Sequence, residues 1–123
     1  SLALVVLFAG SVVAGDVISG NRIKVFLFAA PAFFSEVAVD AYNNTCVSLD
    51  NNLIDGRVRS ILVGGHDVVS VLSRTDGWYC DFFDNYDCSG DDTQRKTFAD
   101  GVNNLGSSGW GRRIHSIRCT NED

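Results

Sequence analysis

Short apolar runs separated by turn-forming residues dominate the chain from residue 23 onward. Runs rich in valine, isoleucine and phenylalanine favour extended strands, whereas glycine, proline and asparagine between them favour turns. A valine-rich run at residues 68–72 predicts a short extra strand. The pattern as a whole predicts an all-β fold with main strands near residues 23–29, 35–41, 46–49, 58–63, 78–83, 94–98 and 114–119.

The beginning of the chain has a different pattern. Residues 2–14 are apolar apart from Gly10 and Ser11. This run is too short to span a bilayer, which needs about 20 residues, so no stable transmembrane span is expected. It is typical of the hydrophobic region of a secretory signal peptide, with a cleavage point before Gly15. Residues 16–22 are polar and predict a linker.

The same apolar segment has a second interpretation. An extended segment rich in valine and leucine is suited to adding a strand to the edge of a sheet, in its own chain or in another copy. If residues 1–15 are retained, we expect self-association through them. The central apolar residues of this predicted assembly segment are Leu4, Val5, Val6, Leu7 and Phe8.

Two stretches of the chain are nearly the same. Asp-Gly-Arg-Val-Arg-Ser-Ile at residues 55–61 returns as Gly-Arg-Arg-Ile-His-Ser-Ile at residues 111–117. Upstream of these, a Leu-Phe pair at 27–28 has its counterpart in a Phe-Phe pair at 82–83. Repetition at this spacing indicates two copies of one supersecondary motif within a single domain.

Composition and charge narrow the class of protein. The chain has 123 residues, enough for one compact domain, and one proline with 12 glycines fits strands and tight turns. Trp78 and Trp110 are expected to pack in the core rather than to form a ligand platform. The net charge is −5, and the absence of a basic run gives a nucleic-acid partner little support.

The four cysteines, Cys46, Cys80, Cys88 and Cys119, predict two disulfides and an oxidising compartment. Their spacing lacks the closely paired ligands of a zinc site. Asn43 begins an Asn-Asn-Thr sequence and is a predicted N-glycosylation acceptor, which is compatible with a secreted, extracellular protein.

The repeated residues resemble the βγ-crystallin superfamily. Residues 23–35 look like the opening strand and folded hairpin of its Greek key, and Leu105, Gly109, Trp110 and residues 114–117 look like the closing half. The short secreted fungal members with four cysteines look nearest. The resemblance implies a sandwich of two Greek-key motifs over residues 23–119: motif 1 near 23–63, a connection at 64–77, and motif 2 near 78–119.

Many members of this superfamily bind calcium through a short signature of Asn/Asp and Ser/Thr residues, but here the signature is degenerate. In the first copy Asp55 and Ser60 match, while Gly56 lacks a ligand and Arg59 places a cation where a hydroxyl belongs. The second copy keeps only Ser116. Because calcium needs six to eight oxygen ligands, we expect no metal at these sites and no cofactor.

The chain also has two groupings of charged residues. The acidic cluster, Asp81, Asp84, Asp87, Asp91 and Asp92, is interpreted as a solvated turn face rather than a cation site. Five arginines repeat between the copies and are interpreted as basic patches or as ordinary surface pairs with the aspartates: Arg57, Arg59, Arg112, Arg113 and Arg118.

The placement of the cysteines in the expected strands leads to a disulfide prediction. Cys80 lies in the first strand of motif 2 and Cys88 just past the following turn, so the fold-back would join them. Cys119, at the end of the last strand, would then pair with Cys46 of the other motif. This placement therefore predicts Cys80–Cys88 and Cys46–Cys119.

No arrangement of nucleophile, base and orienting group is recognisable, so no catalytic residue and no enzyme are predicted. We expect a secreted, disulfide-stabilised structural or self-assembling protein whose extracellular partner the sequence does not identify. Two alternatives stay open: a toxin or antimicrobial protein, and a protease inhibitor acting through the 64–77 loop. One fold hosts many functions, so the fold alone does not decide between them.

Overall fold

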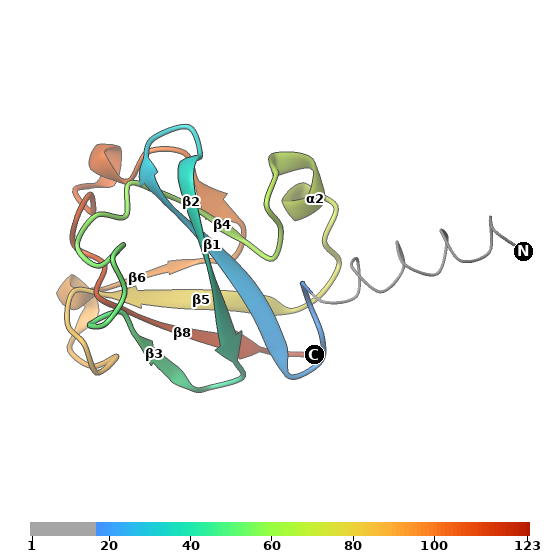
Figure 1. Ribbon diagram of the computed structural model, residues 1–123. Helices are drawn as coiled ribbons and strands as arrows, with labels where there is room; N and C mark the ends of the chain where they lie inside the picture. Colours follow the sequence, from blue (N-terminus) through green and yellow to red (C-terminus); the bar gives the residue numbers. More distant parts are fainter. Residues whose placement is uncertain (1–16) are drawn as a thin grey trace, which may run out of the picture.

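The computed structural model describes residues 17–123, which form two antiparallel sheets (Figure 1). The helical elements are α2 (Val68–Leu72) and the 3₁₀ turns η1 (Asp92–Gln94) and η2 (Leu105–Ser108). The strands are β1 (Arg22–Ala30), β2 (Phe34–Tyr42), β3 (Cys46–Ser48), β4 (Ser60–Val63), β5 (Trp78–Phe83), β6 (Arg95–Phe98), β7 (Gly101–Val102) and β8 (Ser116–Asn121). The predicted all-β class is confirmed.

The two motifs exchange strands. The first sheet has the order β2-β1-β4-β7 and the second has the order β3-β8-β5-β6. Motif 1 thus sends its third strand, β3, to pair with β8, while motif 2 sends β7 to pair with β4. Each sheet contains strands of both motifs, so neither motif can complete its sheet alone. This exchange gives the two-motif Greek-key sandwich that the βγ-crystallin resemblance implied.

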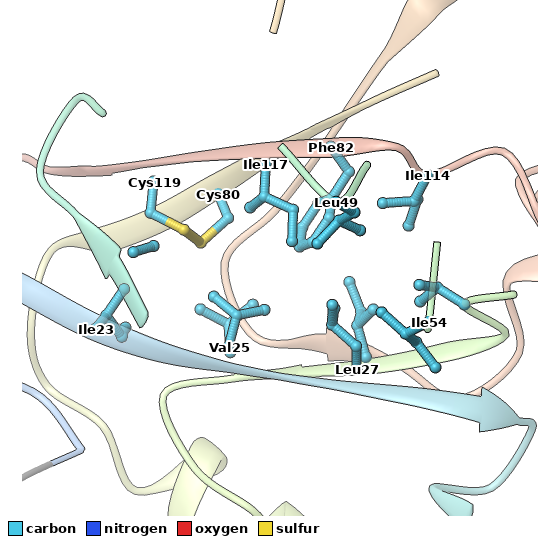
Figure 2. Packing of buried hydrophobic residues seen from close by; sticks show 14 of the residues in the cluster. Ile23, Val25, Leu27, Leu49, Ile54, Cys80, Phe82, Ile114, Ile117 and Cys119 are labelled. Carbon is cyan, nitrogen blue, oxygen red and sulfur yellow. A yellow bond between two sulfur atoms is a disulfide. The ribbon is translucent and has the colours of Figure 1, made fainter. Parts of the chain in front are cut away.

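The main core lies between the two sheets. Alternate residues of β1 point inward and are wholly buried: Ile23, Val25 and Leu27. Figure 2 shows them facing Phe82 and Ile117 of the opposite sheet. Both tryptophans, Trp78 and Trp110, are buried and belong to the same cluster, as predicted. Burial of rings of this size accounts for a large part of the hydrophobic stabilisation.

The outer face of the first sheet is also apolar, and α2 covers part of it. Val71 of α2 is buried there against three side chains: Phe26, Phe28 and Leu62. The carboxylate of Asp67 caps the helix by accepting the Ser70 backbone N–H at 2.7 Å. Strand β1 is therefore buried on both faces over its middle part, which explains the continuous apolar sequence from Val25 to Ala30.

The prediction of an extra strand at 68–72 is wrong. These residues form α2 although valine favours strands, because β4, the nearest strand, already pairs with β1 on one side and β7 on the other. With no free edge to extend, the segment satisfies its backbone groups locally and places Val71 on the outer apolar face. Tertiary packing and the Asp67 cap together outweigh the local propensity.

The predicted disulfide pairing is also wrong. Cys80 bonds to Cys119, and Cys46 bonds to Cys88. Cys80 and Cys119 lie directly opposite each other in the β5–β8 ladder, with Cα atoms 4.0 Å apart, and both are wholly buried between the sheets. Cys88 lies in the turn after β5, where it meets exposed Cys46 at the start of the exchanged strand β3. The Cys46–Cys88 bond joins the two motifs.

Two smaller differences concern short segments. Residues 17–22 form a tight turn on β1 rather than a free linker: Ile18 bridges Ile23, and Lys24 N–H donates to the Val17 carbonyl at 2.8 Å. Strand β7 was not predicted, because two residues carry no periodic signal. A Cβ on Gly101 of β7 would lie only 2.6 Å from the Ile61 carbonyl oxygen, so β7 can approach β4 this closely only with glycine there.

Candidate functional site

The two serines of the degenerate calcium signature hold equivalent turns in the two motifs. Each hydroxyl donates to one backbone carbonyl and accepts one backbone N–H of the turn after the first strand. The partners are the Ala30 carbonyl (2.7 Å) and Phe33 N–H (3.2 Å) for Ser60, and the Asn85 carbonyl (2.6 Å) and Cys88 N–H (3.1 Å) for Ser116. Both serines are wholly buried, so their hydroxyls serve the fold.

The remaining calcium-signature residue, Asp55, belongs to a local cluster with Tyr86 and His115. One carboxylate oxygen of Asp55 lies 2.5 Å from His115 Nδ1, and the other accepts the Tyr86 hydroxyl at 2.6 Å. The Tyr86 and His115 rings lie with centroids 4.9 Å apart. Residues of both motifs thus meet at this place, which we call the Asp55 cluster.

The Asp55 cluster also has an electrostatic consequence for Tyr86. The hydrogen bond to the Asp55 carboxylate raises the pKa of the Tyr86 hydroxyl above its ordinary value, and desolvation adds to this shift. The phenol is therefore held in its protonated, hydrogen-bond-donating form. Both oxygens of the Asp55 carboxylate have protein partners.

The equivalent place in the other motif is an open cleft. The repeat puts Gly111 where Asp55 stands and Arg59 where His115 stands. A Cβ added to Gly111 would lie 3.7 Å from Arg59 Nε, so these two residues are also neighbours. Gly111 lines a cleft of about 280 Å³, and an adjoining cleft of about 410 Å³ shares Arg59 and Arg112 with it. We call the two together the arginine cleft.

Three arginines line the arginine cleft: Arg57, Arg59 and Arg112. Within residues 17–123 none of the three forms an ion pair with a carboxylate. Arg59 Nε is in addition buried without a hydrogen-bond partner in that part of the chain. By contrast, Arg113 pairs with Asp84 at 2.9 Å, and Arg118 lies over the Phe83 ring. The interpretation as ordinary surface pairs therefore fits Arg113 alone of the five.

Millimolar calcium is expected to leave the melting temperature almost unchanged. A ligand at 100 times its dissociation constant would add about 2.7 kcal/mol, but Asp55, Ser60 and Ser116 already bond within the protein, and Arg59 repels a cation. The measurement is thermal unfolding with calcium or with a chelator. A rise of several degrees with calcium, lost in Asp55→Ala, would contradict this prediction.

The aspartates of the acidic cluster each have a local role. Asp81 is buried in β5, so the interpretation as a solvated turn face is wrong for it, and it accepts the Thr97 hydroxyl. Asp84 pairs with Arg113, and Asp91 caps η1. Asp87 accepts the Ser89 hydroxyl at 2.6 Å, and Asp92 pairs with Arg95 at 2.7 Å. Among residues 17–123 no group of three or more His, Cys, Asp and Glu side chains is placed to hold a metal ion.

Other residues singled out in the sequence are not brought into this site. Leu4, Val5, Val6, Leu7 and Phe8 lie outside the described residues. Asn43 is half-buried, and its side-chain oxygen accepts the backbone N–H of Asn121 at 2.9 Å. Glycosylation of Asn43 stays a prediction.

Comparison with known proteins identifies the fold. No protein-family model matches the sequence, and no curated protein matches it. Solved structures do match: one from work on the evolution of the eye lens βγ-crystallin domain fold has a TM-score of 0.59 and 14% identity over 86% of this chain and 95% of that chain. A βγ-crystallin from Ciona intestinalis has a TM-score of 0.53 and 19% identity over 77% and 96% of the two chains.

A third match is the N-terminal domain of protein S, with a TM-score of 0.55 and 14% identity over 80% of this chain and 97% of that chain. These likenesses, together with the exchanged strands and the paired serine turns, show that the protein has the βγ-crystallin fold. It is a compact domain of that fold stabilised by two disulfides. No helix within residues 17–123 is long and apolar enough to cross a membrane.

Proposed function

We propose that the protein is a secreted, non-enzymatic structural protein whose copies associate with one another. The observation that carries this proposal is the Cys46–Cys88 bond, which joins the two motifs, together with the Cys80–Cys119 bond inside the core. Disulfides of this kind persist in oxidising compartments and rarely in the cytosol. The two disulfides therefore support an extracellular, structural role, for which a stable fold is needed.

The chemistry of the Asp55 cluster supports a non-enzymatic role. A nucleophile needs a lowered pKa or a base that removes its proton. Here the Asp55 hydrogen bond raises the pKa of Tyr86 instead, and His115 is tied to the same carboxylate. The four cysteines, which are the other potential nucleophiles, are all disulfide-bonded. The cluster thus connects the two motifs and resembles a structural contact more than a catalytic site.

An exposed apolar surface around α2 supports self-association. Val69 and Leu72 of α2 are 75% and 70% exposed, and Leu72 lines a small cleft together with Phe33 and Leu62. Val17, the first described residue, packs into the cluster beneath α2. The described part of the chain therefore begins next to this surface. We assign the apolar surface around α2 to contact with residues 1–15 of a second copy.

Removing residues 1–15 is expected to convert an associating protein into a folded monomer. The test compares the masses of chains 1–123 and 16–123 by light scattering, with near-ultraviolet circular dichroism as the control for folding. The variant Leu72→Ser in the full chain is expected to weaken association, since Leu72 is exposed and its loss leaves the core unchanged. A monomeric full-length chain, or native material that starts at Gly15, would contradict self-association and favour the signal-peptide interpretation.

The protease-inhibitor alternative receives less support. Residues 64–77 include α2, which Val71 anchors in the apolar cluster, and end in a loop held by Arg74. An inhibitor of the expected kind would display an exposed, rigid binding loop, whereas this connection is helical and attached at two points. Titration against serine and cysteine proteases tests the alternative directly, and growth inhibition tests the toxin alternative.

A further inference from the structure

The Asp55 cluster and the arginine cleft are two versions of one site. In the Asp55 cluster, a carboxylate lies 2.5 Å from a ring nitrogen of His115. In the arginine cleft, Arg59 replaces the histidine and Gly111 replaces the aspartate. The basic partner is therefore present in both places, but the acidic partner is present in only one. Within residues 17–123, Arg59 therefore has no carboxylate at the point close to Gly111 where His115 has that of Asp55.

The backbone of the cleft reinforces this interpretation. Arg112 has φ 69°, a left-handed conformation that glycine adopts easily and arginine does not. Its counterpart in the repeat, Gly56, has the same φ of 69°. An arginine held in this conformation lies beside Arg59 and Arg57, neither of which has an ion pair within residues 17–123, and the three concentrate positive charge on a protein whose net charge is −5. Backbone strain of this kind gathers at functional sites.

We propose that the arginine cleft binds a phosphate-type oxyanion. The anion would occupy the place corresponding to the Asp55 carboxylate and accept a hydrogen bond from the buried Arg59 Nε, which has no partner within residues 17–123. Arg57 and Arg112 line the same cleft and supply further donors. This site goes beyond the proposed structural role and does not depend on it.

The charge of the cleft favours a multiply charged anion such as phosphate over a simple carboxylate. Three guanidinium groups bring a formal charge of about three to the cleft at neutral pH, since arginine does not deprotonate in proteins. Planar guanidinium donors match phosphate oxygens in pairs. The clefts of about 410 Å³ and 280 Å³ share two of the arginines, so there is room for a phosphate attached to a larger group.

The proposal is tested by thermal unfolding in phosphate and in pyrophosphate, each compared with sodium chloride of the same ionic strength. We expect the phosphate salts to raise the melting temperature of the wild type beyond the effect of chloride, and Arg59→Met to weaken binding at least tenfold. Arg95→Gln, which removes an exposed arginine paired with Asp92 outside the cleft, is the matched control and should respond like the wild type.

A second pair of variants tests the phosphate site while keeping all three arginines of the cleft. Gly111→Asp rebuilds the carboxylate of the Asp55 cluster, and a Cβ at Gly111 meets no atom closer than 3.5 Å. We expect Gly111→Asp to melt at a higher temperature than the isosteric Gly111→Asn and to lose the phosphate response. Equal melting temperatures of these two variants would overturn the proposal.

Two further outcomes of the titrations would also overturn it: a wild type that responds to phosphate no more than to chloride, and an Arg59→Met variant that responds like the wild type. Flotation with phosphatidylcholine vesicles, with and without phosphatidic acid, distinguishes free phosphate from a lipid headgroup. The net charge of −5 opposes approach to an anionic membrane, so we expect free phosphate to bind and the vesicles not to. Vesicle binding that requires Arg59 would support the same site with the phosphate on a lipid.

Discussion

Replacing both Cys80 and Cys119 by alanine is expected to lower the free energy of unfolding by about 4 kcal/mol or more. The two residues are 39 apart in sequence, and closing a loop of that length restricts the unfolded chain by about 4 kcal/mol at 25 °C in the chain-entropy model. Both sulfur atoms also lie in the core, so their removal leaves space between the sheets. Urea unfolding at pH 7 measures the change.

The other disulfide provides the matched comparison. Cys46 and Cys88 are 42 residues apart, so the entropic contribution is nearly the same, but Cys46 is exposed and little core volume is lost. The double alanine variant of Cys80 and Cys119 should therefore be the less stable of the two. Equal stabilities would contradict the argument from burial. Peptide mapping that links Cys80 to Cys88 would contradict the disulfide pairing itself.

Arg74→Met is expected to destabilise the protein by about 3 kcal/mol at pH 7. The Arg74 side chain is only 7% exposed and bonds to carbonyls of both sheets: Val63 of β4 at 3.1 Å and Trp78 of β5 at 2.9 Å. It also bonds to the Ala99 carbonyl at 2.5 Å and pairs with the Asp76 carboxylate. Methionine keeps the apolar stem but leaves these acceptors without their donor.

The Arg74–Asp76 pair adds a pH dependence whose direction can be stated. The hydrogen bond from Arg74 lowers the pKa of Asp76 below 3.8, although burial opposes the shift. A lowered folded-state pKa stabilises the protein above the unfolded pKa, and that contribution is lost as the pH falls through the folded value. The stability difference between wild type and Asp76→Asn should therefore be largest near neutral pH and shrink below about pH 3.8.

Urea midpoints at pH 7 and at pH 2.5 provide the comparison. Arg95→Met is the control for the Arg74 variant, because Arg95 forms an exposed pair with Asp92 that is worth less than about 1 kcal/mol. If Asp76→Asn lost as much stability at pH 2.5 as at pH 7, the carboxylate charge would not be the source of the effect.

The fold was predictable from the sequence because its main signals are local or repeated. The apolar run of β1, the turn residues after each strand, and the two copies around Ser60 and Ser116 can be recognised without knowing what lies beside them in space. Trp78 and Trp110 were correctly predicted as core residues, since rings of their size are stable mainly when buried. These features depend on side-chain character, which the sequence states directly.

Other features depended on neighbours that no sequence pattern names. Arg74 was not singled out, because most of its acceptors are backbone carbonyls, and carbonyls have no sequence signature. The helical conformation of α2 followed from the absence of a free edge beside β4. The disulfide pairing followed from the β5–β8 register, in which Cys80 faces Cys119; a one-residue slip would have turned the two side chains to opposite faces.

The arginine cleft was predictable from the sequence only in part. The sequence repeat by itself determined that Arg59 stands in place of His115 and Gly111 in place of Asp55. Only the tertiary structure decided that these paired positions meet, one from each motif, because β3 and β7 exchange sheets and bring the two motifs together. Residues of different motifs become neighbours through strand pairing over long sequence separations, and such pairing depends on the whole fold rather than on any local run of residues.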